Sequence, residues 1–280
     1  MQRPNLSQST GFAQRFSKED KALYITIAIT ALAAILLITF LMIWSVSRAT
    51  GCASKNPNDD TNSQQSGSQQ SSYTAVLDKT DDMGQSYIDS MIFLGDSNTA
   101  HMRSFGVLSG GKSTKQVWTP VSSTLALDSQ ITSKKIVYPE TDEQITIAEA
   151  ARRAKPKYLV ISLGTNGLSY LDKEQFKYCY TKLLNAIKEA SPDTKIIIQS
   201  IYPVTDWYKN LKNEKINEAN GWLIEIATEA KVKYIDTASV LKNSNGALKE
   251  TFNSYHNDGY HINAEAYEKI LDYIRTHGWQ

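Results

Sequence analysis

The sequence contains few cysteines, few histidines and almost no excess charge. It has two cysteines, Cys52 and Cys179, and four histidines among 280 residues. Two widely separated cysteines cannot provide a disulfide framework. The formal net charge is +1, which excludes the strongly basic composition typical of nucleic-acid-binding proteins. We therefore expect no nucleic-acid partner. Cys179 lies on the apolar side of a predicted helix and is expected to be buried.

Charge is absent altogether from residues 22–47. As a helix these 26 residues would span about 39 Å, whereas the hydrocarbon core of a membrane needs only about 20 apolar residues. Tyr24 and Trp44 lie near the two ends, where interfacial aromatic residues are common. A buried core helix is excluded by the length of the run and its lack of polar residues. We therefore predict a transmembrane anchor helix over residues 22–47.

Basic residues indicate the orientation of this helix. Four precede it, namely Arg3, Arg15, Lys18 and Lys21. By the positive-inside rule, we expect residues 1–21 to form a short cytoplasmic tail and the rest of the chain to lie outside, at a bacterial cell surface. One alternative is a cleaved signal peptide, whose apolar region is normally shorter. Another is a lipoprotein cleavage site at residues 49–52, which would place a lipid on Cys52.

Apolar residues are scarce between the predicted anchor and the first predicted strand. Residues 48–86 are rich in Ser, Gln, Asn, Asp and Thr. Such a composition cannot bury enough apolar surface to offset the entropy of ordering the chain. We therefore predict a disordered linker over residues 48–86 and a single folded domain over residues 87–280.

Strand and helix patterns alternate along the predicted domain. Short apolar runs closed by turn residues predict strands, and apolar positions three and four residues apart predict helices. The expected strands cover 91–94, 116–118, 135–138, 158–163, 195–200 and 232–236. The expected helices cover 99–105, 143–154, 173–190 and 213–230, with a last helix capped by Asn263. Because the strongest strands are apolar on both faces, we predict an α/β fold, a three-layer α/β/α sandwich around a parallel sheet.

Polar residues gather directly after the first predicted strand. The apolar run 91–94 ends in Gly95-Asp96-Ser97-Asn98, and a glycine permits a sharp turn into the next helix. This places Ser97 at the carboxyl end of a strand, where open α/β sheets bind their ligands. The N–H groups at the start of a helix would lie close by. Ser97 is therefore a candidate nucleophile, although a serine that only caps a helix would have the same local sequence.

Two further segments supply partners for Ser97. Asn166 follows the second strong strand, and its amide could bind an oxyanion together with the backbone N–H of Ser97. His261 precedes the last helix and could accept the serine proton, while Asp258 could fix the tautomer of the histidine. Asn166 could instead be only a turn residue. His256, Asp258 and His261 could instead bind a metal ion.

These segments together resemble the SGNH (GDSL-type) hydrolase family. The matching segments are Gly95-Asp96-Ser97, Gly164-Thr165-Asn166 and Asp258-Gly259-Tyr260-His261. The resemblance implies the flavodoxin-like sandwich of that family. It also implies Ser97 as nucleophile, Asp258 and His261 as the rest of a catalytic triad, and Asn166 as an oxyanion donor.

The sequence departs from the family pattern at two positions. The family's second block supplies a glycine N–H to the oxyanion hole, but the segment after Trp118 contains no glycine. The N–H of Ser122 or Ser123 is an alternative donor. Gly167 stands where the family often has aspartate. Both departures concern the shape of the acyl pocket rather than the nucleophile or the base.

Several ring-bearing side chains lie close to these segments. His101, one helical turn after Ser97, could line the site, but it is expected to be an exposed helix residue. Tyr202, Trp207 and Tyr208 follow a predicted strand and are expected either to edge the cleft or to cover the sheet.

Together these features predict a membrane-anchored, extracytoplasmic serine esterase. Its expected substrates are O-acyl esters, foremost O-acetyl esters, on surface or extracellular carbohydrate, a substrate class that follows from the family analogy and the predicted location. The triad chemistry needs no metal or organic cofactor. Alternatives on the same fold are a lysophospholipase, a thioesterase or an acyltransferase. A catalytically idle surface binding module is the alternative from a different class, and hydrolysis of a simple acetate ester would separate it from an enzyme.

Overall fold

The computed structural model describes residues 73–280. The predicted cytoplasmic tail 1–21, the predicted anchor 22–47 and the predicted linker as far as residue 72 lie outside the described residues. Within residues 73–280, no helix combines the length and the apolar character that crossing a membrane requires.

Five parallel strands form the central sheet, in the order β2-β1-β5-β6-β7. Their bounds are β1 Met91–Gly95, β2 Val117–Trp118, β5 Tyr158–Ser162, β6 Lys195–Gln199 and β7 Lys233–Ile235. The chain passes from β1 outwards to β2 and then continues in β5 on the other side of β1. The strand order therefore reverses between β1 and β5. Open α/β sheets bind ligands outside the carboxyl ends of the strands at such a switch point.

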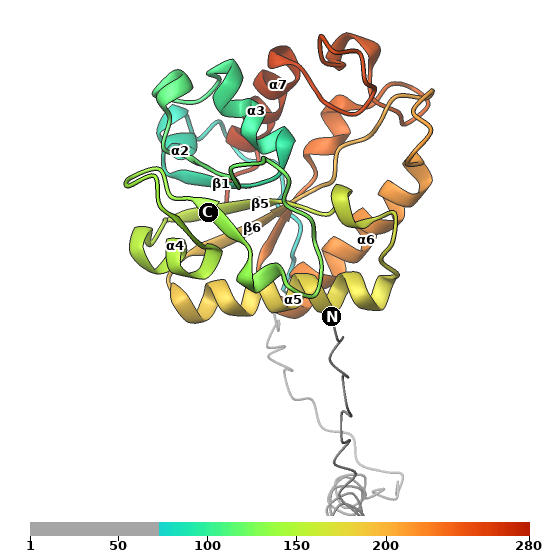
Figure 1. Ribbon diagram of the computed structural model, residues 1–280. Helices are drawn as coiled ribbons and strands as arrows, with labels where there is room; N and C mark the ends of the chain where they lie inside the picture. The colour runs from blue at the N-terminus through green and yellow to red at the C-terminus, as the bar shows by residue number, and fades with distance from the viewer. Residues whose placement is uncertain (1–72) are drawn as a thin grey trace, which may run out of the picture. The chain divides into compact units, whose positions relative to one another are not determined.

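Helices cover both faces of this sheet, which explains why its strands are apolar on both faces (Figure 1). The helices are α2 Gln85–Asp89, α3 Ser97–Phe105, α4 Ile147–Ala154, α5 Lys173–Ala190, α6 Asn213–Ala230 and α7 Ala264–Arg275. Along β1, Leu94 belongs to the core beneath α4, α5 and α6, whereas Met91 and Phe93 belong to the core beneath α2, α3 and α7. The predicted three-layer α/β/α sandwich is confirmed.

Local signals at the helix ends agree with the sequence patterns. The side chain of Asp172 accepts from the backbone N–H of Gln175, and the side chain of Gln175 bonds back to the Asp172 N–H, a capping box at the start of α5. Asn263 caps α7 as predicted, accepting from the N–H of Ala266. Cys179 lies within α5 and is buried among apolar side chains, which confirms its interpretation as a small core residue.

One predicted helix begins later than expected. Residues 143–154 carry a helical pattern, but Gln144–Thr146 form strand β4, which pairs antiparallel with β3, Lys135–Val137, in a separate two-stranded sheet. The helix α4 starts only after Thr146, whose hydroxyl accepts from the N–H of Glu149. The β-branched side chains at positions 145 and 146 favour a strand, and pairing with β3 decides between the two states.

The ordered domain also begins before the predicted boundary at residue 87. Val76 forms a parallel bridge with Tyr234 of β7. The N–H of Leu77 donates to the Tyr234 carbonyl, and the N–H of Tyr234 donates to the Ala75 carbonyl, each at 2.9 Å. Ala75 and Leu77 are buried. Residues 73–86 therefore belong to the domain rather than to the predicted linker, because a short apolar stretch at 75–77 docks on the edge strand of the sheet.

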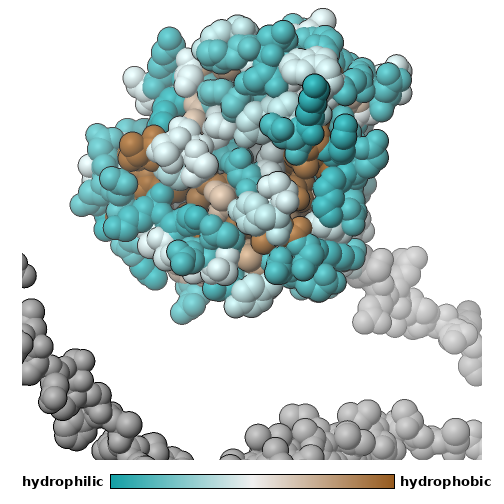
Figure 2. Space-filling model, turned by 45° about the vertical axis from the view of Figure 1, so that its right-hand side comes forward, coloured by the Kyte–Doolittle hydropathy of each residue, from teal (hydrophilic) through white to brown (hydrophobic). Residues whose placement is uncertain are grey.

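The surface of the domain is mostly hydrophilic on the face drawn in Figure 2. Hydrophobic side chains reach that face only as small areas separated by hydrophilic ones. Scattered apolar residues of this kind are normal on a protein surface and do not by themselves mark a docking site.

Candidate active site

The turn between β1 and α3 presents Ser97 at the carboxyl edge of the sheet. The carboxylate of Asp96 caps α3 by accepting from the N–H of Asn98 at 3.2 Å. Ser97 is the first residue of the helix, and the first N–H groups of a helix have no partner within it. The turn requires glycine at position 95, because a Cβ there would lie 2.0 Å from the Thr99 hydroxyl oxygen and 2.6 Å from the Ser162 carbonyl oxygen. The sequence around Ser97 therefore builds a tight, rigid start to the helix.

A second turn, between residues 258 and 261, orients the histidine. One carboxylate oxygen of Asp258 accepts from the backbone N–H groups of Tyr260 and His261, at 3.0 and 2.8 Å. Its other oxygen lies 2.7 Å from Nδ1 of His261. Gly259, at φ 77°, packs so closely against Thr205 and Trp207 that a side chain there would collide with both. The turn holds the aspartate and the histidine in one fixed arrangement.

The structure joins these two turns into one hydrogen-bonded chain. Nε2 of His261 lies 2.9 Å from Oγ of Ser97, and Nδ1 of the same ring faces the Asp258 carboxylate. Ser97 and His261, which this chain joins across the two turns, are 164 positions apart in the sequence. The side chains of His261 and Asp258 are only 21% and 34% exposed, so water weakens these contacts less than it would at an open surface.

The ionisation of Asp258 suits this arrangement. Burial by itself raises the pKa of the Asp258 carboxyl, but the hydrogen bonds from the His261 backbone and ring and from the Tyr260 backbone outweigh it, so that the pKa lies below its ordinary value. A carboxylate against Nδ1 favours the tautomer with hydrogen on Nδ1. Nε2 is then an acceptor, and the hydroxyl of Ser97 donates to it.

Asn166 also lies beside the Ser97 turn. It belongs to the short 3₁₀ turn Thr165–Gly167 that follows β5, the strand next to β1 at the switch point. Its side-chain amide donates to the second carboxylate oxygen of Asp96 at 3.0 Å. One amide hydrogen is therefore held by Asp96, and the amide has a second hydrogen to donate.

Asp96 links Ser97 and Asn166, and it is the most deeply buried carboxyl of the site, with 3% exposure. Burial raises its pKa to about 7, although backbone N–H bonds at the helix start, including that of Asn98, oppose the rise. The folded protein therefore retains a proton on Asp96 over a pH range in which the unfolded chain has released it. This contribution to stability is present at low pH and is lost as the pH rises from about 4 towards 7.

Replacing Asp96 by asparagine is expected to remove this pH dependence. Between pH 5 and 7 the free energy of unfolding of the wild type should fall, relative to Asp96→Asn, by up to about 1.4 kcal/mol for each pH unit. Urea unfolding of both proteins at pH 5, 6 and 7 measures the difference. Asp193→Asn, at an exposed loop position, is the matched control and should follow the wild type. Parallel pH curves for Asp96→Asn and the wild type would contradict the account.

Two further side chains lie at the site, one of them, Tyr260, with no role expected from the sequence and the other, His101, in the place that the sequence left as the alternative. The hydroxyl of Tyr260 lies 3.4 Å from Oγ of Ser97. The ring of His101 lies 4.8 Å from the ring of His261 and is half-buried, so the expectation of an exposed histidine is wrong. Burial, followed by the charge of His261, lowers the pKa of His101. The only sequence signal for Tyr260 is its place inside the segment 258–261, and the signal for His101 is its position one turn after Ser97.

The structure does not identify an oxyanion donor in the segment after β2, where the sequence offered the N–H of Ser122 or Ser123. Residues 120–123 form a turn in which the N–H of Ser123 donates to the Pro120 carbonyl at 2.9 Å. The N–H of Ser123 is therefore engaged within the turn. Ser122 is exposed, and among residues 73–280 no hydrogen bond joins it to Ser97.

The alternative metal site is not assembled in the described part of the chain. Within residues 73–280, no three histidine, cysteine, aspartate or glutamate side chains converge as potential ligands. His256 is exposed and its ring lies 3.9 Å from that of Tyr255, while Asp258 and His261 bond each other.

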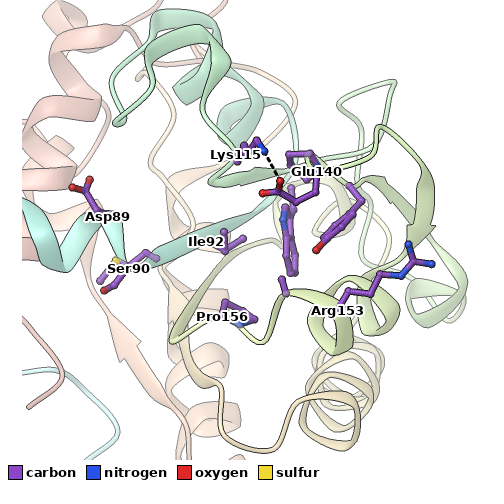
Figure 3. A pocket seen from close by; sticks show the side chains of 12 residues that line it. Asp89, Ser90, Ile92, Lys115, Glu140, Arg153 and Pro156 are labelled. Carbon is purple, nitrogen blue, oxygen red and sulfur yellow. Dashed lines mark hydrogen bonds and ion pairs between the residues drawn. The ribbon is translucent and has the colours of Figure 1, made fainter.

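A separate cavity of about 400 Å³ lies at the start of β1 (Figure 3). Ser97 follows the other end of that strand. Ile92 lines it, and an ion pair joins Lys115 and Glu140 beside it. The one serine in its lining, Ser90, donates to the Tyr87 carbonyl rather than to a base. The cavity therefore lacks the nucleophile–base pair that the carboxyl edge has.

Comparison with known proteins agrees with the sequence resemblance. The family model described as GDSL-like lipase/acylhydrolase matches residues 93–269, more than half of the chain. This match includes Ser97, Asn166, Asp258 and His261. No curated protein is significantly similar to the chain in sequence.

Several solved structures are similar to this chain. The periplasmic domain of a lipopolysaccharide acetyltransferase from Salmonella ser. Paratyphi A is 18% identical, with a TM-score of 0.44, over 65% of this chain and 81% of that one. A GDSL-like lipase from Bacteroides thetaiotaomicron is 18% identical, with a TM-score of 0.42, over 68% and 87%. A carbohydrate esterase family 3 protein from Talaromyces cellulolyticus is 17% identical, with a TM-score of 0.42, over 65% and 92%.

Proposed function

The chain belongs to the GDSL-like lipase/acylhydrolase family, and from that premise we propose that it is a serine esterase in which Ser97, His261 and Asp258 form the catalytic triad. The observation that carries this proposal is the continuous hydrogen-bonded chain from the Asp258 carboxylate through His261 to Oγ of Ser97. These three hydrogen-bonded side chains lie at the switch point of the sheet, where this fold type binds its ligands.

Acylation follows from the geometry of these groups. As Oγ of Ser97 bonds to the ester carbon, its proton passes to Nε2 of His261, and the carbonyl electron pair moves onto the carbonyl oxygen. The Asp258 carboxylate stabilises the imidazolium that forms. When the tetrahedral intermediate collapses, the carbon–oxygen bond to the leaving alcohol breaks, and Nε2 returns the proton to that oxygen.

Deacylation uses the same groups with water in place of the alcohol. His261 takes a proton from water while the water oxygen bonds to the acyl carbon, and Ser97 leaves with the proton that His261 returns. In both halves of the reaction the negative oxygen is stabilised by the Ser97 N–H at the start of α3 and by the second amide hydrogen of Asn166. Their hydrogen bonds are worth most when they are already aimed at the position where the charge develops.

Carbohydrate is the substrate class that the surroundings of the triad support best. Four of the large hydrophobic side chains that are exposed lie in segments that follow sheet strands or in the loop that carries the histidine: Val121, Tyr170, Trp207 and Tyr255. Three of them are tyrosine or tryptophan, whose side chains combine a flat, largely apolar ring with one polar O–H or N–H group. A sugar ring likewise has an apolar C–H face and a polar rim. We therefore propose O-acyl groups, foremost O-acetyl groups, of surface or extracellular carbohydrate as the substrate.

The proposed location rests on the sequence. Residues 22–47 would anchor the chain in the membrane, with residues 1–21 inside and the esterase domain outside. Tyr73, the first described residue, bonds through its hydroxyl to the Val232 carbonyl beside the start of β7. The chain therefore enters the domain at the amino edge of the sheet, and the triad lies at the carboxyl edge.

The dependence of kcat/KM on the length of the acyl group tests the substrate proposal. Among p-nitrophenyl esters, kcat/KM should be highest for acetate and should fall at least roughly tenfold by octanoate, because a site shaped for acetyl rejects added methylenes. Release of acetate from acetylated cell-wall polysaccharide should depend on Ser97. Ser97→Ala is the control for background hydrolysis. A value of kcat/KM that rises with chain length would instead identify a lipid esterase.

A further inference from the structure

Tyr260 gives Ser97 a second hydrogen-bonding neighbour on the reacting side. Its hydroxyl oxygen lies 3.4 Å from Oγ of Ser97. Because Ser97 donates its hydrogen to Nε2 of His261 at 2.9 Å, a lone pair on Oγ remains to accept. The hydroxyl of Tyr260 is therefore the donor of this pair, and its hydrogen points at the nucleophilic oxygen.

The ring of Tyr260 is held firmly in this position. It stacks on the ring of Tyr208 at a centroid distance of 5.9 Å and an interplanar angle of 17°. Its backbone N–H is fixed by the Asp258 carboxylate at 3.0 Å. A donor that is fixed before the reaction loses little entropy when charge appears beside it.

The hydroxyl stays protonated under the conditions in which the enzyme would work. Burial, and next the charge of Asp96, raise the pKa of Tyr260 to about 12. The hydroxyl can therefore act as a hydrogen-bond donor at neutral pH.

We propose that Tyr260 is a catalytic residue whose hydroxyl donates to the oxyanion, as a third donor beside the Ser97 N–H and the Asn166 amide. The proposal rests on the proposed function of Ser97. When Oγ bonds to the ester carbon, its lone pairs become poor acceptors, and the full negative charge forms on an oxygen only two bonds from Oγ. The tyrosine hydrogen can move from Oγ to that oxygen with a small rotation about the phenolic C–O bond. Tyr260 keeps its proton throughout, and the only proton that moves between residues is the one from Ser97 to His261.

The role of oxyanion donor differs from two other roles for the same hydroxyl. A tyrosine that stabilised the leaving alcohol would act only in acylation, because deacylation has water in place of that alcohol. A tyrosine that only shaped the pocket would change KM rather than kcat. An oxyanion donor acts in both chemical steps, since each passes through a tetrahedral oxyanion.

Tyr260→Phe tests the proposal, because it removes the hydroxyl and keeps the stacked ring. With acetate esters, kcat should fall by roughly 10²- to 10³-fold at nearly constant KM, and the loss should be the same for leaving alcohols of low and high pKa. The single-turnover rate of acyl-enzyme hydrolysis should fall by a similar factor. The affinity for a boronic acid, which forms a tetrahedral adduct on Ser97, should weaken as well. Tyr178→Phe, on the exposed surface of α5, is the matched control and should retain wild-type activity.

Four results would overturn the proposal: an unchanged kcat, a change in KM alone, a loss confined to acylation, or a loss that grows with the pKa of the leaving alcohol. The failure of this proposal is distinguishable from failure of the proposed function. If Ser97→Ala is inactive while Tyr260→Phe is fully active, only the role of Tyr260 is wrong. If Ser97→Ala is active, the serine mechanism itself is wrong.

Discussion

Ser97→Ala is expected to lower kcat for ester hydrolysis by roughly 10⁵- to 10⁶-fold. Alanine has no oxygen to bond the acyl carbon, so the covalent route through an acyl-enzyme disappears. His261→Ala should have a similar effect, because the hydroxyl of Ser97 then loses the acceptor that lies 2.9 Å from it. Since the two residues act as a unit, the double variant should be scarcely worse than either single one.

The control for this experiment lies on the same helix. Ser104 is exposed near the end of α3, and its hydroxyl donates to the Ala100 carbonyl one turn earlier, so Ser104→Ala should keep wild-type activity. A fluorophosphonate should label Ser97 in the wild type and in Ser104→Ala and should not label Ser97→Ala. Full activity of Ser97→Ala would contradict the mechanism. So would inactivation of the wild type by a chelator with recovery on added zinc, since it would restore the metal interpretation of His256, Asp258 and His261.

Asp258→Asn is expected to lower kcat by up to about 10⁴-fold while leaving the fold intact. An asparagine oxygen can still accept the backbone N–H groups of Tyr260 and His261, which Asp258 now binds at 3.0 and 2.8 Å. The turn should therefore persist. The side-chain amide would, however, face Nδ1 of His261 with a hydrogen, which favours the tautomer with hydrogen on Nε2. In that tautomer the ring cannot accept the proton of Ser97.

The measurement for Asp258→Asn has to separate chemistry from folding. Thermal unfolding should remain cooperative, with a midpoint within a few degrees of the wild type, while kcat falls. Asp206→Asn is a suitable control, because Asp206 is an exposed loop residue whose described side-chain bond goes to Asn243. A loss of activity that tracks a loss of folded protein would contradict the tautomer argument. An Asp258→Asn protein with nearly full activity would show that His261 needs no carboxylate to orient it.

The buried carboxyl of Asp96 connects two parts of the site that the triad hydrogen bonds do not join, the helix start at Ser97 and the amide of Asn166. It caps the helix that begins at Ser97 and holds the amide of Asn166 at 3.0 Å. A change at Asp96 therefore acts on the proposed nucleophile and on a proposed oxyanion donor together. This coupling follows from the strand order, because the turns after β1 and β5 are neighbours only where those two strands pair.

Much of the fold could be predicted from the sequence, because the spacing of apolar residues along the chain indicates which side chains are buried. The runs at 91–94, 158–163 and 195–200 are apolar on both faces, and the structure places them at the centre of a parallel sheet covered by helices on each side. The candidate nucleophile follows directly from this pattern, because a turn that closes a central parallel strand must lie at the carboxyl edge of the sheet.

Tertiary structure alone decided the features that depend on pairing between distant segments. Residues 144–146 have a helical pattern but form a strand because they pair with β3. Residues 75–77 were predicted to belong to the linker, but they are part of the domain because Val76 pairs with the edge strand β7. The hydroxyl of Tyr260 and the ring of His101 reach the site only through the packing of the 258–261 turn against α3. Local sequence sets which side chains are buried and where a strand ends. The distances between side chains more than 150 positions apart are set by strand register and helix packing, which no local pattern contains.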